Sequence, residues 1–92
     1  MRVTVRYQTQ IKRAVGLASE TLEVPEACPV AELLRQLAQR HGDAFRRLVL
    51  KEGGLPQDSI LVFLGERQVA DLPALRLSDV DVLTLLAPMA GG

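Results

Sequence analysis

The chain has 92 residues, of which 48% are hydrophobic, 24% are charged and only 3% are aromatic. This is enough for one small domain with a modest core, and too little to enclose a large active site as well. Eleven Lys and Arg residues balance eleven Asp and Glu residues, so the sequence lacks the excess positive charge typical of proteins that bind nucleic acid or an anionic membrane surface.

Cysteine content and hydropathy exclude further classes of protein. Cys28 is the only cysteine, which excludes an intramolecular disulfide and a multi-cysteine metal site. No apolar run reaches the length of a signal peptide or of a membrane span. We therefore expect a cytoplasmic protein with no membrane and no nucleic-acid partner.

The first quarter of the chain predicts two strands. Val3, Val5 and Tyr7 alternate with polar residues, which is the period of a half-buried strand. Residues 18–24 alternate again, and we expect them to pair with the first strand. The link 8–16 is longer than a tight hairpin needs, so we expect a wide or bulged turn there.

The clearest predicted helix follows these strands. Pro29 suits its first turn, where a missing N–H costs nothing, and Gly42 stands where a C-terminal cap belongs. Asp43 can then cap a shorter helical turn. The apolar face of the main helix follows the spacing 0, 3, 4, 7, 8, 11: Val30, Leu33, Leu34, Leu37, Ala38 and His41.

The second half of the chain predicts three more strands, at 60–64, 68–70 and 80–87, with a short turn around Pro73 before the last. One helix across a mixed sheet whose middle holds the first and last strands is an α+β arrangement. We expect residues 1–87 to form this domain. Residues 88–92 are then a tail leaving a central strand, because Pro88 has no N–H to continue the pairing.

The last strand is apolar on both faces, but one helix can cover only one face of a small sheet. We expect Leu83 and Leu85 to pack against the helix. An apolar patch left on the outer face marks a protein interaction site, and scattered apolar residues or a shielded strand end are the alternatives. With Val62 as an alternative to Phe63, the expected partner interface is Phe63, Thr84 and Leu86.

Three other features have ordinary structural explanations. His41 has no carboxylate or serine at a spacing that indicates acid–base catalysis, so we expect it to interact with the last carbonyls of its helix. Cys28 fits a small residue near the helix start. Arg46 and Arg47, with Arg40, could contact an acidic partner, but a solvated helix face is the ordinary explanation for them.

The sequence ends on Gly91-Gly92, and the ending resembles a known family. Residues 77–92, LSDVDVLTLLAPMAGG, are similar to the ending of the MoaD/ThiS sulfur carriers: a Gly/Asp-rich turn, an apolar strand, a proline, two small or apolar residues and Gly-Gly. Residues 7–16 and 29–34 resemble the first loop and the helix start of that family. Val80 stands where the MoaD pattern usually has glycine, and Leu85-Leu86 replaces an aromatic pair.

The resemblance implies a ubiquitin-like β-grasp fold, with a mixed sheet of four to five strands on one main helix and a flexible C-terminal tail. It also implies that a partner enzyme uses ATP to adenylate the carboxylate of Gly92, and that a sulfur donor converts it to a thiocarboxylate. The chain itself would bind no cofactor or metal and would not be an enzyme. The residues expected to thread into the partner are Pro88, Met89, Ala90 and Gly91.

The ending is most similar to that of MoaD, which implies molybdopterin biosynthesis and a sulfur-accepting enzyme such as the molybdopterin synthase large subunit. Carriers for thiamine, cysteine or tRNA thiolation resemble one another and stay open. Another alternative is a ubiquitin-like modifier joined through Gly92 to lysines of other proteins. A third is a plain interaction domain whose tail is incidental.

Overall fold

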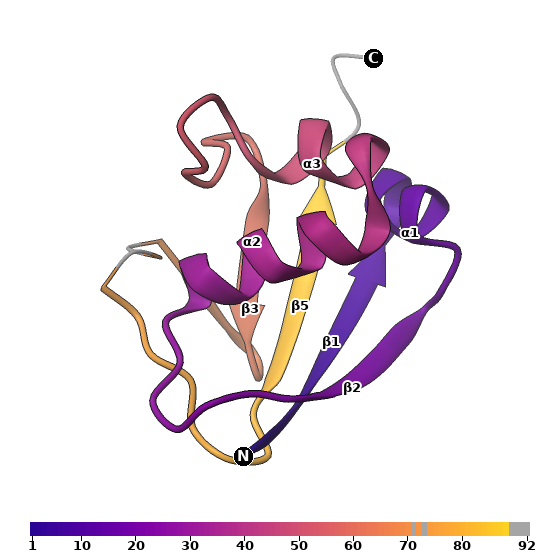
Figure 1. Ribbon diagram of the computed structural model, residues 1–92. Helices are drawn as coiled ribbons and strands as arrows, with labels where there is room; N and C mark the ends of the chain where they lie inside the picture. Colours follow the sequence, from indigo (N-terminus) through magenta and orange to yellow (C-terminus); the bar gives the residue numbers. More distant parts are fainter. Residues whose placement is uncertain (71, 73, 89–92) are drawn as a thin grey trace.

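A computed structural model describes residues 1–70, 72 and 74–88 (Figure 1). One sheet carries a long helix across its face, and two short helices lie at the end of the sheet toward which β1 and β5 point. The elements in chain order are β1 (Arg2–Gln8), α1 (Thr9–Val15), β2 (Ser19–Glu23), α2 (Val30–His41), α3 (Asp43–Val49), β3 (Leu61–Leu64), β4 (Arg67–Val69) and β5 (Val82–Ala87).

The five strands form a single mixed sheet in the order β2-β1-β5-β3-β4. β1 and β5 are parallel, with Val5 opposite Leu83, and the other three pairings are antiparallel. β5 is therefore the central strand and β1 lies beside it. The predicted α+β class and the central position of the first and last strands are both confirmed.

The core lies between α2 and one face of the sheet. α2 contributes six buried residues from its predicted apolar face and its first turn, and β5 alternates between half-buried and buried positions along its whole length. Leu83 and Leu85 are both fully buried, which confirms that their side of β5 faces the helix. At roughly 25 cal/mol per Å² of apolar surface, this single layer supplies most of the driving force for folding.

The link between the first two strands was predicted wrongly. Thr9–Val15 form helix α1, not a wide or bulged turn. The helix buries Ile11 against the core and ends at Gly16, whose φ of +83° is the left-handed conformation that glycine adopts without strain. Seven residues do not hold a helix in water by themselves, so burial of Ile11 stabilises α1.

Gly42 ends α2 as predicted, with φ of +93° and its N–H donating to the carbonyl of Ala38 at 3.0 Å. It also directly precedes α3, so Asp43 lies in the first turn of that helix and is not its cap residue. The predicted cap at Asp43 is therefore wrong, although a carboxylate in the first turn still favours the helix dipole. The predicted turn around Pro73 lies outside the described residues.

The last strand begins two residues later than predicted, because Val80 has φ of +61° and cannot be part of a strand. Val80 is 79% exposed, and its N–H donates to the carbonyl of Arg2 at 2.8 Å. A β-branched residue in the left-handed region is strained. The position therefore favours glycine on conformational grounds, which agrees with the glycine usual at this place in the MoaD pattern.

Replacing Val80 by glycine is expected to stabilise the protein. The substitution relieves strain of order 1–3 kcal/mol, and the greater freedom of glycine in the unfolded chain offsets about half of it, for a net gain of about 1 kcal/mol. The free energy of unfolding in urea measures the effect. Val80→Ala keeps the positive φ without the β-branch and should gain less. A V80G variant no more stable than the wild type contradicts this account.

Candidate functional site

The end of β5 is held firmly before the chain continues to the tail. Thr9 pairs with Ala87 through a parallel bridge. The Thr9 hydroxyl lies 2.7 Å from the Gln8 carbonyl oxygen and 2.8 Å from that of Ala87, and its one hydrogen is shared between these two acceptors. Ala87 is buried, while Pro88 is exposed. Thr9 has φ of +54°, a strained conformation for a β-branched residue and one often found at functional sites. The carbonyl before Pro88 is thus fixed in position.

Two short helices flank this end of the sheet. α1 packs against α3 and against β5, and both helices lie at the end where β5 finishes (Figure 1). Pro88 therefore emerges beside α1, against which α3 packs in turn. The remaining predicted tail residues lie outside the described residues, and their roles stay predictions: Met89, Ala90, Gly91 and Gly92.

The predicted partner interface forms a continuous apolar patch on the outer face of the sheet. Phe63 lies directly opposite Thr84, and Leu61 lies opposite Leu86. All four are half-buried, although none of the helices in the described part of the chain covers this face. Val62 is only 1% exposed and faces the core, so the outer-face residue of β3 is Phe63.

Sequence reasoning missed two members of this patch, Leu61 and Val82. Both are half-buried, and both lie two residues from a predicted member of the patch on the same strand. Because strand side chains alternate between faces, that spacing was a sufficient signal. The outer-face patch, as we use the name below, is Leu61, Phe63, Val82, Thr84 and Leu86.

A cluster of polar side chains around Glu20 is a second candidate site. The Tyr7 hydroxyl donates to Glu20 at 2.5 Å, the His41 ring contacts the same carboxylate oxygen at 2.5 Å, and Arg40 pairs with the other oxygen at 3.2 Å. Tyr7 and His41 pack edge-on to one another, and both rings contact Phe45. The prediction that His41 interacts with the helix carbonyls is wrong: it binds Glu20.

The ionisation of this cluster follows from its burial and its hydrogen bonds. Burial opposes the charged form of Glu20, but hydrogen bonds from Tyr7 and His41 and the charges of His41 and Arg40 outweigh it and hold the pKa of Glu20 below its ordinary value. Burial, followed by the hydrogen bond to Glu20, raises the pKa of Tyr7 well above its ordinary value. Tyr7 therefore stays neutral, and the cluster ties β1 and β2 to the end of α2.

Cys28 is equally unsuited to chemistry. It is 3% exposed and lies just before α2. Burial, and then the negative charge of Glu32, raise the pKa of the Cys28 thiol, whereas a nucleophilic cysteine needs a lowered pKa. The prediction of a small packed residue near the helix start agrees with this environment.

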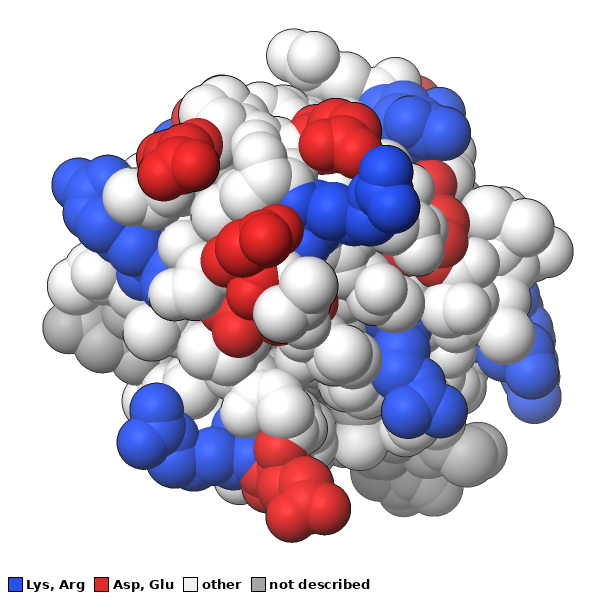
Figure 2. Space-filling model, turned by 90° about the horizontal axis from the view of Figure 1, so that it is seen from below, with Lys and Arg blue, Asp and Glu red and all other residues white. Residues whose placement is uncertain are grey.

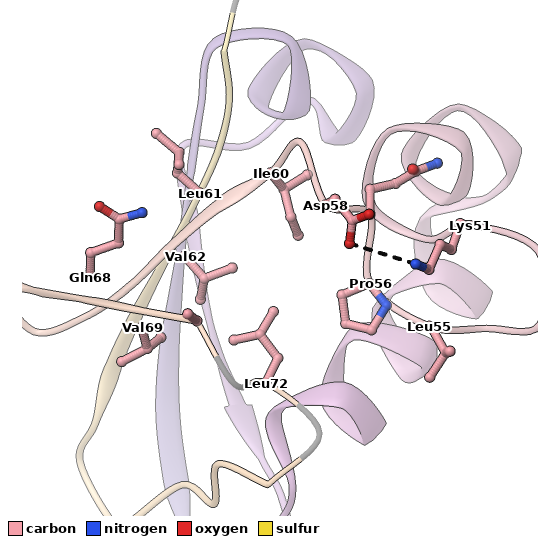
Figure 3. A pocket seen from close by; sticks show the side chains of 12 residues that line it. Lys51, Leu55, Pro56, Asp58, Ile60, Leu61, Val62, Gln68, Val69 and Leu72 are labelled. Carbon is pink, nitrogen blue, oxygen red and sulfur yellow. Dashed lines mark ion pairs between the residues drawn. The ribbon is translucent and has the colours of Figure 1, made fainter.

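A hollow in the surface beside β3 and β4 is an open groove of about 340 Å³ (Figure 3). Ile60, Val62 and Leu72 line its floor, and Lys51 pairs with Asp58 across one side at 3.6 Å. The described residues that line it include no paired carboxylates and no nucleophile beside a base, which are the arrangements that catalysis requires. Within the described part of the chain, no group of three His, Cys, Asp or Glu side chains is placed to hold a metal.

Comparison with known families and curated proteins gives one match. The ThiS family model matches residues 5–92. A search of curated proteins gave no match. Among residues 1–70, 72 and 74–88, no helix is long and apolar enough to cross a membrane.

Several solved structures share the fold. The chain is similar to a protein assigned as molybdopterin converting factor subunit 1 from Pyrococcus furiosus (26% identity, TM-score 0.74, 95% of this chain and 97% of that one). It is also similar to a chain of the BexX/CysO complex of Amycolatopsis orientalis (28% identity, TM-score 0.68, 98% and 99%). Small archaeal modifier protein 1 of Haloferax volcanii, at 20% identity, shares the fold alone (TM-score 0.81, 95% and 97%). These similarities confirm the ubiquitin-like β-grasp fold.

Replacing Glu20 by glutamine is expected to destabilise the protein by about 1–3 kcal/mol at neutral pH, because a half-buried carboxylate that accepts several hydrogen bonds is lost. Urea unfolding measures the effect. Glu23→Gln on the same strand is the matched control. The side chains of Glu23 and of its ion-pair partner Arg2 are both exposed, so loss of this ion pair should lower the free energy of unfolding by less than about 1 kcal/mol.

The difference between wild type and E20Q should depend on pH. Since the folded-state pKa of Glu20 lies below its ordinary value of 4.5, its stabilisation is present above that value and is lost as the pH falls through the lower folded-state pKa. The two stability curves should therefore converge in acid. A difference that stays constant down to acid unfolding contradicts the assignment.

Proposed function

The chain belongs to the ThiS family, and from this premise we propose that it is a sulfur carrier that acts through the carboxylate of Gly92. The observation that supports the proposal most strongly is the anchored end of β5. Thr9 fixes the Ala87 carbonyl, Pro88 cannot extend the strand pairing, and the last residues start from one exposed point beside the outer-face patch. A partner enzyme that docks on the outer-face patch would therefore find the start of the tail at a fixed place relative to the docked surface.

The proposed chemistry takes place at one carboxylate in a partner's active site. A carboxylate oxygen of Gly92 attacks the α-phosphorus of ATP, and pyrophosphate leaves. The terminal sulfur of a persulfide donor attacks the acyl carbon of this adenylate, and AMP leaves. A second thiol of the donor then attacks the donor-side sulfur and breaks the S–S bond, so the donor becomes a disulfide and Gly92 becomes a thiocarboxylate.

The sequence of the tail fits this role. A carboxylate must first gain a good leaving group, and positioning beside the α-phosphate supplies much of the rate. Gly91 and Gly92 have no Cβ, so they fit a narrow channel that would exclude larger residues. The carrier supplies no acid, base or metal, and ATP is bound by the partner.

The partners follow from this chemistry: an adenylating enzyme, a sulfur donor and a sulfur-accepting enzyme. Molybdopterin biosynthesis is our first choice of pathway, supported by the similarity to the converting factor subunit of Pyrococcus furiosus over nearly the whole chain. The acceptor is then an enzyme such as the molybdopterin synthase large subunit. Cysteine biosynthesis, thiamine biosynthesis and tRNA thiolation are the alternatives.

A modifier function is the second candidate, favoured by the shared fold of a small archaeal modifier protein. Both functions begin with the same adenylate, so they differ only in the final nucleophile: a sulfur for the carrier and a lysine amine for the modifier. Peptides from cell extracts with the chain's C-terminus in isopeptide linkage to lysines would favour the modifier.

Incubation with the cognate adenylating enzyme, ATP and a persulfide donor is expected to replace one oxygen of the protein by sulfur. Intact-mass spectrometry measures the change, and alkylation of the new thiocarboxylate confirms its position at Gly92. A variant lacking Gly91 and Gly92 is the control and should stay unmodified. Unchanged mass of the wild type, with an enzyme that modifies another carrier, rejects the proposal.

A charge in the outer-face patch is expected to weaken docking. Phe63→Asp should lower kcat/KM for adenylation by about tenfold or more, because a half-buried aromatic residue at an interface commonly contributes over 1 kcal/mol. Gln36→Asp is the control, since Gln36 is exposed on α2, which covers the opposite face of the sheet. Circular dichroism and thermal unfolding verify that both variants fold.

Equal rates for the Phe63→Asp and Gln36→Asp variants would show that the outer face does not dock the adenylating enzyme. The mass change at Gly92 would still test the carrier function by itself.

A further inference from the structure

Four exposed cations lie on the two short helices beside the end of β5. Lys12 and Arg13 are on α1, and Arg46 and Arg47 are on α3. All four are exposed, and α1 packs against both α3 and β5. The end of the molecule from which Pro88 emerges is therefore bordered by positive charge. We call these four residues the basic collar.

The basic collar is not neutralised within the described part of the chain. None of its four side chains forms an ion pair there, and Asp43 is the single acidic residue on α1 and α3. Arg40, which the sequence grouped with Arg46 and Arg47, pairs with the carboxylate of Glu20 instead. Arg40 thus belongs to the polar cluster around Glu20, whereas Arg46 and Arg47 are exposed and form no ion pair in the described part of the chain.

The opposite end of the molecule is different. Figure 2 looks at that end and shows positive and negative side chains interspersed. Arg2 pairs there with Glu23 at 3.0 Å, and Asp79 accepts a hydrogen bond from the Arg2 backbone. Among the described residues, Arg6, Arg67 and Arg76 also form no ion pair, but they lie in separate segments, whereas the four collar cations lie on two helices that pack together. A solvated helix face explains one exposed arginine pair, but not the grouping of four such cations on two helices in contact.

We propose that the basic collar is a docking surface for an acidic protein surface around the entrance that receives the tail; this inference rests on the proposed function. Like charges placed together repel one another in the free protein. An acidic partner surface offsets this repulsion and attracts the collar. Three of the four cations are arginines, which give up water more easily than lysine and are enriched at protein interfaces.

The occupant is a protein surface and not the nucleotide itself. Gly92 follows Pro88 by four residues, which span about 13 Å when extended. A tail threaded in extended form into a partner's channel would carry the carboxylate, and the ATP that activates it, away from α1 and α3. The collar instead contacts the rim through which the tail enters, and with the outer-face patch it fixes the carrier's orientation.

Charge reversal in the collar tests the proposal. Arg46→Glu with Arg47→Glu is expected to lower kcat/KM for adenylation about tenfold at about 0.05 M salt, with the loss shrinking toward twofold at about 0.5 M as salt screens the charges. ATP–pyrophosphate exchange with the adenylating enzyme measures the rate. Both kcat at saturating carrier and KM for ATP should stay unchanged. Lys12→Glu with Arg13→Glu should act in the same direction.

The matched control reverses two exposed cations at the opposite end, Arg67→Glu with Arg76→Glu, and changes the net charge equally. It should stay within about twofold of the wild type at both salt concentrations. Thermal unfolding verifies that every variant is folded. An equal loss in control and collar variants overturns the proposal, because net charge then explains it.

Two other results also overturn the proposal. A collar variant whose rate and salt dependence match the wild type shows that the collar contacts nothing. A change confined to KM for ATP shows that the collar holds the nucleotide. In both cases the wild type is still adenylated, so the proposed carrier function is not contradicted. A wild type that is never adenylated would reject both the carrier function and the docking role of the basic collar.

Discussion

The parallel pairing of β1 with β5 is the interaction on which the rest of the structure depends. It joins the two ends of the chain in the middle of one sheet, and it requires the whole intervening chain to form the crossover. That crossover contains α2, which covers one face and leaves the other bare. The same pairing continues to Thr9 and Ala87, so the point at which the tail begins is set by the most buried part of the fold.

Two strained residues mark the two ends of β5. Val80, with positive φ, lies just before the strand begins, and Thr9, also with positive φ, holds the strand where it finishes. The side chain of Val80 does little to offset its strain, since that residue is 79% exposed. The strain at Thr9 is offset by the hydrogen bond of its hydroxyl at the base of the tail. Strain kept beside the point where the tail begins is what a functional constraint at the proposed site predicts.

A small domain with one covering layer leaves apolar surface exposed, because its surface is large for its volume. Here that surface lies on the strand that leads to the tail, and the basic collar lies at the end of the same strand. Apolar contact supplies affinity and charge supplies orientation and rate of encounter. On the proposed function, the two surfaces together would let a partner enzyme recognise the carrier from one side.

The sequence by itself determined the elements with regular local periods. The apolar spacing of α2, the alternation of β1 and the two-sided character of β5 depend only on neighbouring residues, so the α+β class, the buried Leu83 and Leu85, and most of the outer-face patch were predicted correctly. The same alternation along the strands also places Leu61 and Val82 on the outer face, so the sequence was sufficient to predict them as members of the patch. The ending in Gly91-Gly92 is local as well, and it predicts the proposed chemistry at the terminal carboxylate.

Only the tertiary structure decided the rest, because the interactions concerned join residues far apart in the chain. α1 is too short to form without the core that buries Ile11. His41 binds Glu20, 21 residues away, and Thr9 binds Ala87, 78 residues away, and no local pattern encodes such pairs. The basic collar likewise exists only because the fold brings α1 and α3 together at the end of β5.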